Sequence, residues 1–106
     1  MPEDPLKILK KLDPKLLKLV EDTREFAHAD GALPKKFKFL IAMALDASHG
    51  TVQGTMACAR GAMQAGATKE EIMEALRVAQ YICGVGSVYT AAQALEQLFQ
   101  PKNYKE

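Results

Sequence analysis

The side chains most able to do chemistry in this chain gather in the ten residues from His49 to Cys58. His49 is a potential general base near neutral pH, and Cys58 is a potential nucleophile or redox-active thiol. Thr51 and Thr55 add two hydroxyl groups at helical spacing within the same stretch. Together with the free N–H groups of a helix start, these residues could bind and process a small carboxylated molecule.

The two cysteines, Cys58 and Cys83, do not form a pattern typical of a dithiol or metal site. They are far apart in the sequence, and no nearby histidine completes a zinc site. Cys58 lies two turns into its predicted helix without a basic neighbour, and Cys83 lies near a helix C-terminus, so we expect both thiols to be protonated. For each cysteine, a small buried hydrophobic side chain is the alternative interpretation.

His49 also has two interpretations, because it lies just before the predicted break at Gly50. It could overhang the next helix as a general base, oriented by Asp46 one turn earlier, or it could simply be a favourable cation at a helix end. Thr51 is either a substrate-binding hydroxyl or an ordinary helix cap. His28, which also ends a helix, is interpreted as structural.

Other polar side chains gather around the later helices. Tyr81 and Tyr89 flank a glycine-rich link and could line a ligand pocket, or they could pack on the core with their hydroxyls at its rim. Glu70, Glu71 and Glu74 lie at a helix start, where acidic residues are favoured in any case. We therefore expect no metal site there.

The elements that position these residues are predicted to be helices throughout. Apolar residues recur with a 3.6-residue period, and no segment alternates with a period of two. The predicted helices cover about residues 6–12, 14–29, 34–48, 51–65, 68–83 and 87–99, with Ser87 as the cap of the last helix and Pro101 as its stop. The connections are short, which favours an all-α, compact bundle of about six helices in one domain of residues 1–106, with a core at 33–98 and N-terminal helices at 6–29.

Composition narrows the possible partners. The formal net charge of +1 gives no global signal for nucleic-acid binding, and no apolar run reaches membrane length. We expect a reduced, cytoplasmic protein with no cofactor, no nucleic-acid partner and no membrane partner. The third and sixth predicted helices are apolar over wide arcs, so we expect the chain to assemble as a homo-oligomer.

A joint between two predicted helices carries the most specific motif. Gly66-Ala67 ends one helix, Thr68-x-x-Glu71 forms a capping box for the next, and a Gly84-Val85-Gly86 link follows. With the preceding Leu40–Leu45 segment, this pattern resembles the carboxymuconolactone decarboxylase superfamily, which includes alkylhydroperoxidase D-like proteins. The resemblance covers somewhat over half of the chain.

The resemblance implies an all-α fold and assembly as a homotrimer or homohexamer. Peroxidase-type members carry Cys-x-x-Cys-x-x-x-His ahead of this joint, together with an upstream Glu. In the same register, the Cys pair falls on Thr51 and Gly54, the His on Cys58 and the Glu on Phe39. Decarboxylase-type members lack the Cys pair but keep the His, so neither catalytic set is present here.

We therefore expect a divergent member of this family. The first hypothesis is a cofactor-free decarboxylase-like or lyase-like enzyme, or a small-ligand binder, that acts on a small carboxylated molecule. Its catalytic residues would be His49 and Cys58, and its substrate-binding residues would be Thr51, Thr55, Tyr81 and Tyr89. The alternative is an alkylhydroperoxidase-like antioxidant, with peroxiredoxin-type activity, that uses a single thiol.

Overall fold

The structure is a computed structural model that describes residues 4–99. It contains the 3-10 helix η1 (Pro5–Ile8) and the α-helices α1 (Leu9–Leu12), α2 (Pro14–His28), α3 (Lys35–Ser48), α4 (Val52–Gln64), α5 (Lys69–Cys83) and α6 (Gly86–Phe99). No strand occurs in this range, which confirms the all-α prediction. None of the helices in residues 4–99 has the length and apolar character needed to cross a membrane.

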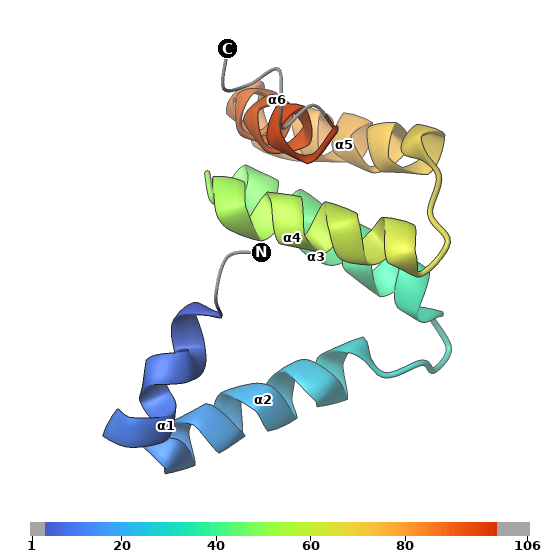
Figure 1. Ribbon diagram of the computed structural model, residues 1–106. Coiled ribbons are helices and arrows are strands. Elements are labelled where there is room, and N and C mark those ends of the chain that lie inside the picture. The colour runs from blue at the N-terminus through green and yellow to red at the C-terminus, as the bar shows by residue number, and fades with distance from the viewer. Residues whose placement is uncertain (1–3, 100–106) are drawn as a thin grey trace.

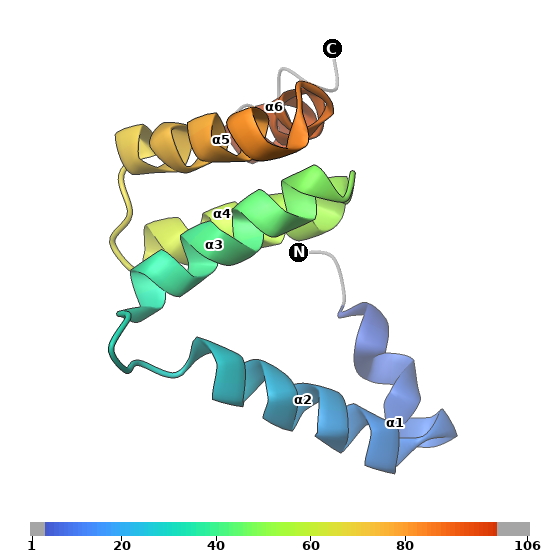
Figure 2. The ribbon, with the colours of Figure 1, turned by 180° about the vertical axis from the view of Figure 1, so that it is seen from behind.

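Helices α3 to α6 form a body with a shared core, while η1, α1 and α2 form an arm that diverges from it (Figure 1, Figure 2). In the body, α3 lies beside α4 and α5 lies beside α6. The core is built mainly from small residues, which allow the helix axes to approach closely. Its most buried members include Met43, Ala59, Ala62, Ile72 and Ala91.

The turn between α3 and α4 confirms the predicted break at His49–Gly50. Gly50 has a φ of 79°, a conformation that favours glycine. The turn is closed by the backbone N–H of Thr51, which donates to the carbonyl of Asp46 at 3.0 Å. Because this turn is tight, the end of α3 and the start of α4 are held side by side.

The joint between α4 and α5 has the predicted capping box. The hydroxyl of Thr68 accepts from the N–H of Glu71 at 3.1 Å, and the Glu71 carboxylate accepts from the N–H of Thr68 at 2.9 Å. The Glu71 carboxylate also pairs with Lys36 on α3 at 3.1 Å. The hydrogen bond from the Thr68 N–H, followed by the one from Lys36, lowers the pKa of Glu71. The box therefore starts α5 and ties it to α3.

The prediction that Ser87 caps α6 was wrong, because this helix begins at Gly86. Gly84, with a φ of 91°, reverses the chain, and the carbonyl of Val85 accepts the first helical N–H groups. Ser87 consequently lies inside the first turn, where it is buried and its hydroxyl donates to the carbonyl of Gly84 at 2.8 Å. The predicted stop at Pro101 lies outside the described residues.

The arm is fixed to the body where α2 meets α3. The N–H of Lys35 donates to the Asp30 carboxylate at 2.7 Å, and the Lys38 ammonium donates to the carbonyl of Ala29 at 2.6 Å. The ring of His28 stacks on the ring of Phe39, with centroids 4.4 Å apart. These contacts fix the side of α3 from which the arm leaves.

Candidate functional site

A carboxylate and a thiol meet between α3 and α4. The Cys58 thiol, on α4, donates to Oδ2 of Asp46, on α3, at a distance of 3.5 Å. Both side chains are half-buried. The pair lies one to two helical turns from the α3–α4 turn.

The surroundings of Cys58 disfavour its thiolate. Burial raises the pKa of the thiol, and the negative charge and hydrogen bond of Asp46 raise it further, from the ordinary 9.0 to about 12. The thiol is therefore protonated at neutral pH, as the sequence led us to expect. The expectation rested on the absence of a basic neighbour, whereas the structure adds burial and an acidic neighbour.

Gly54 makes room for the Asp46 carboxylate. A Cβ atom at Gly54 would lie 2.6 Å from Oδ2 of Asp46 and 3.1 Å from Cγ2 of Thr51. In the family register, Gly54 occupies the position of the second cysteine of peroxidase-type members. In this chain the Asp46 carboxylate fills the space that a side chain at that position would need.

In the register that the resemblance implies, Phe39 stands at the position of the family's glutamate. Phe39 packs so closely on α4 that a Cβ atom at Gly61 would lie 2.6 Å from its Cε1. His28 stacks on the same ring, and its Nδ1 is buried and has no hydrogen-bond partner within residues 4–99. This part of the α3–α4 interface therefore has no carboxylate. The carboxylate at this interface belongs to Asp46, seven residues after Phe39. This spacing is two turns along the same face of α3.

The side chain of His49 does not meet Asp46 in the way that we expected. His49 is exposed, and only its backbone N–H bonds to the end of α3, at 3.1 Å to Leu45 and 3.2 Å to Asp46. Within the described part of the chain, its imidazole makes no hydrogen bond. The Asp46 carboxylate faces Cys58 instead, so the structure brings together an acid and a thiol rather than an acid and an imidazole.

The two threonines have different surroundings. Thr51 is exposed at the start of α4 and makes no side-chain capping bond. Thr55 is fully buried, and its hydroxyl donates to the carbonyl of Thr51 at 2.7 Å. In a single chain, the Thr55 hydroxyl thus supports the first turn of α4, and only Thr51 can reach a solute.

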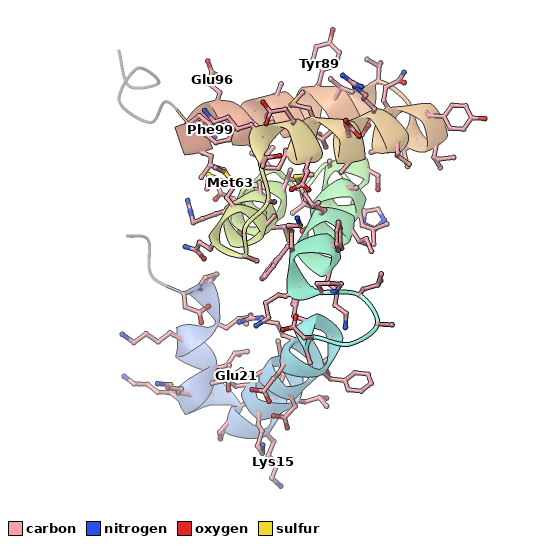
Figure 3. The ribbon with its side chains drawn as sticks, turned by 90° about the vertical axis from the view of Figure 1, so that its right-hand side faces the viewer. Lys15, Glu21, Met63, Tyr89, Glu96 and Phe99 are labelled. Carbon is pink, nitrogen blue, oxygen red and sulfur yellow. The ribbon has the colours of Figure 1, made fainter. Side chains whose placement is uncertain are left out.

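The two tyrosines do not pack on the core. The side chains of Tyr81 and Tyr89 are 83% and 69% exposed. Figure 3 shows Tyr89 directed away from the body, on the outer side of α6. One chain therefore gives neither ring a pocket in common with Cys58.

Two apolar hollows on the body lie apart from the Asp46–Cys58 pair. A groove of about 690 Å³ runs between α3 and α5, and a smaller cleft of about 290 Å³ lies between α5 and α6. Neither is lined by Asp46 or Cys58. No cluster of three or more potential metal-ligating side chains occurs within residues 4–99.

Comparison with known proteins decides the family. The model of the carboxymuconolactone decarboxylase family matches residues 14–97. The chain belongs to this family. The matched range begins at the start of α2 and ends near the end of α6.

Two solved structures support the assignment. A carboxymuconolactone decarboxylase family protein from Legionella pneumophila is 36% identical, with a TM-score of 0.79 over 87% of this chain and 81% of that chain. A carboxymuconolactone decarboxylase-type protein from Burkholderia xenovorans LB400 is 23% identical, with a TM-score of 0.82 over 99% of this chain and 82% of that chain, and shows the same fold. A search of curated proteins found no significant match.

Proposed function

We propose that this family member is a cofactor-free acid–base enzyme that decarboxylates a small carboxylated molecule, with Cys58 as the proton donor. The observation that supports this proposal is the 3.5 Å contact between the Cys58 thiol and the Asp46 carboxylate in a half-buried site. A thiol with a pKa of about 12 keeps its proton at neutral pH, so a proton is available at the site.

The proposed reaction needs one proton and no oxidant. When the substrate loses CO₂, the electron pair of the broken carbon–carbon bond remains on the neighbouring carbon. Cys58 donates its proton to that carbon, which forms the new C–H bond and leaves a thiolate. Because the pKa of the thiol is about 12, the thiolate then takes a proton back from water. Asp46 positions the thiol and favours its return to the protonated form.

The substrate carboxylate has a binding position at the start of α4. The first N–H groups of a helix lack partners within that helix and attract anions. Exposed Thr51 precedes this turn, and exposed His49 lies two residues earlier. We assign both side chains to holding the carboxylate.

A peroxidase function fits this site less well. Attack on a peroxide needs a thiolate, and the usual dithiol cycle needs a second thiol within reach. Burial and Asp46 both disfavour the thiolate of Cys58. Cys83 is the last residue of α5 and is exposed, whereas Cys58 lies in the middle of α4.

The test is a decarboxylation assay, by CO₂ release, over a panel of small β-keto acids and carboxylated lactones. We expect Cys58→Ala to lower kcat by about 10²-fold or more, which is typical for loss of a positioned proton donor. His49→Ala should raise KM more than it lowers kcat. The matched control is Cys83→Ser, which should leave both constants unchanged.

Two results would contradict the proposal. One is a decarboxylation rate that survives Cys58→Ala. The other is peroxide consumption that wild type performs and Cys58→Ala loses, because it would assign Cys58 to the antioxidant alternative.

A further inference from the structure

The cleft between α5 and α6 is an apolar hollow that the proposed decarboxylation site does not use. It has a volume of about 290 Å³ and lies between two helices that run side by side (Figure 1). Its deepest lining belongs to the core, since Leu76 and Ala91 are 5% and 1% exposed. Met73 and Val88, which also line it, are 49% and 39% exposed. The cleft therefore opens to solvent and reaches the apolar core.

The size of the cleft fits one small ligand. Its lining on α5 runs from Met73 to Gln80, and its lining on α6 runs from Val88 to Leu95. In each case the two ends are seven residues apart, which is about 10 Å of helix. The volume lies just below the range of about 300–1,000 Å³ that is usual for ligand pockets. The cleft therefore has room for a single hydrocarbon chain or ring.

One side chain gives the cleft its charge. Arg77 is the only charged residue among the described side chains that line it, and Gln80 adds an amide. Arg77 takes part in neither of the two ion pairs of residues 4–99. The acid one helical turn earlier, Glu74, lines the α3–α5 groove on a different face of α5. Arg77 thus brings an unpaired positive charge, within the described part of the chain, to an otherwise apolar lining.

The α3–α5 groove, which is the larger hollow, carries the opposite charge. Its lining includes the carboxylates of Glu71 and Glu74. Glu71 pairs with Lys36, whereas Glu74 forms no ion pair within residues 4–99. A molecule with a hydrocarbon part and a negative charge is therefore disfavoured in the groove and favoured in the cleft. Charge, rather than size, distinguishes the two hollows.

We infer that the α5–α6 cleft binds an apolar monocarboxylate. Its hydrocarbon part lies against Leu76 and Ala91, and this burial supplies most of the affinity. Its carboxylate accepts hydrogen bonds from the Arg77 guanidinium, whose planar group can donate two in parallel. The ion pair selects an anion over a cation of the same length. This site is independent of the proposed decarboxylation, because neither Asp46 nor Cys58 lines the cleft.

The first test is a titration with octanoate of protein that carries carbon-13 in its methionine methyl groups. Met73 lines the cleft, and its signal reports on binding there. The methionines of α3 and α4 do not line it and serve as internal controls: Met43, Met56 and Met63. We expect octanoate to shift the Met73 signal in a saturable way at millimolar concentration and to leave the other three in place. Octylammonium, with the same chain and the opposite charge, should bind more weakly.

The second test changes the lining of the cleft. Arg77→Met keeps an unbranched side chain but removes the charge, and should weaken octanoate binding by about fivefold, the upper range for an exposed ion pair. Arg77→Glu should reverse the preference, so that octylammonium binds more tightly than octanoate. Ala92→Leu should weaken the binding of both, because it fills the cleft. The matched control is Arg24→Met, which replaces an exposed arginine of α2 outside the cleft and should leave octanoate binding unchanged.

Three results would each overturn the inference. A Met73 signal that octanoate leaves unchanged would show that the cleft does not accept this ligand. Equal binding of octanoate and octylammonium would show that charge does not select the ligand. Wild-type affinity for octanoate in Arg77→Met would show that the guanidinium does not hold the carboxylate. Because Arg77 and Ala92 are exposed, circular dichroism should show unchanged helix content in all of these variants.

Discussion

The carboxylate of Asp46 affects Cys58 in the opposite way to the basic neighbour of a redox-active cysteine. A nearby cation lowers the pKa of a thiol and creates a nucleophile, whereas Asp46 and burial together raise the pKa of Cys58. Gly54 leaves room for this carboxylate, and Phe39 fills the neighbouring part of the α3–α4 interface with an apolar ring. The site therefore favours a thiol that keeps its proton.

This pKa predicts a loss of stability at alkaline pH. The folded-state pKa of Cys58 is about 12 and its ordinary value is 9.0, so the folded chain binds this proton more tightly than the unfolded chain. The contribution of Cys58 to stability is then complete below about pH 9 and is lost as pH rises toward 12. We expect the unfolding free energy of wild type relative to Cys58→Ser to fall across this window. Denaturant unfolding at a series of pH values measures the difference in unfolding free energy between the two proteins. The titration of lysines and tyrosines contributes equally to both proteins and cancels in this difference.

A difference that stays constant from pH 8 to pH 11 would contradict this prediction, because it would mean that Cys58 titrates alike in the folded and unfolded chains. Cys83 is present in both proteins and provides an internal control.

At this scale the sequence predicted the state of Cys58 but not its partner. The absence of basic neighbours at helical spacing was enough to predict a protonated thiol. The sequence instead associated Asp46 with His49, which follows it by three residues, just beyond the end of α3. The partner of Asp46 depends on how α4 packs across α3, and a one-dimensional pattern does not contain that packing. The one signal in the sequence was the seven-residue spacing between Phe39 and Asp46, which places both residues on the same face of α3.

At the scale of elements, the helix ends followed from local chemistry and were largely predictable. Asp13-Pro14 begins α2, with the Asp13 carboxylate accepting from the N–H of Leu16 at 3.0 Å, and the Thr68–Glu71 box begins α5. The prediction that Ser87 caps α6 was wrong although a serine before an apolar run is a typical helix cap. The conformation of Gly84 moved the start of α6 by one residue and placed Ser87 inside it.

The two glycines of α4 predict different results when each is changed to alanine. Gly61→Ala would push on the Phe39 ring, on which His28 is stacked. Overpacking of this kind costs about 1–3 kcal/mol, more than the roughly 1 kcal/mol that alanine gains over glycine in a helix. We therefore expect Gly61→Ala to lower the free energy of unfolding. Gly54→Ala would displace the end of the Asp46 side chain and press lightly on Cγ2 of exposed Thr51, so stability should change little while the pKa of Cys58 falls.

Thermal unfolding and the pH dependence of thiol alkylation, both in a Cys83→Ser background, measure these two effects. The reverse pattern, with Gly61→Ala neutral and Gly54→Ala leaving thiol alkylation as it is in wild type, would show that α3 and α4 are not in the close contact described here.

At the scale of the whole molecule, the sequence predicted the class of the fold and its family, but not the place of the arm. Helical periodicity and short connections indicated a six-helix bundle, and the structure has six α-helices within residues 4–99. The apolar residues of α2 lie on more than one face, so they predict that the helix is covered without indicating by which chain. The direction of the arm depends on the contacts of His28 and Lys38 between α2 and α3. These are tertiary contacts, which a sequence pattern does not contain.

If other copies of the chain cover the exposed apolar side chains of α2, as the expected homo-oligomer implies, folding and assembly are linked, and stability must depend on concentration. A partner that binds only the folded chain stabilises it by mass action. We therefore expect the Tm of wild type to rise by several degrees between a dilute and a concentrated sample, and the Tm of Phe26→Asp to be independent of concentration. Tyr89→Asp should keep the wild-type dependence. Because Phe26 is 85% exposed in the single chain, its replacement has little to disturb except an interface between chains. A wild-type Tm that is the same at every concentration would mean that the chain folds alone and that its apolar faces stay uncovered.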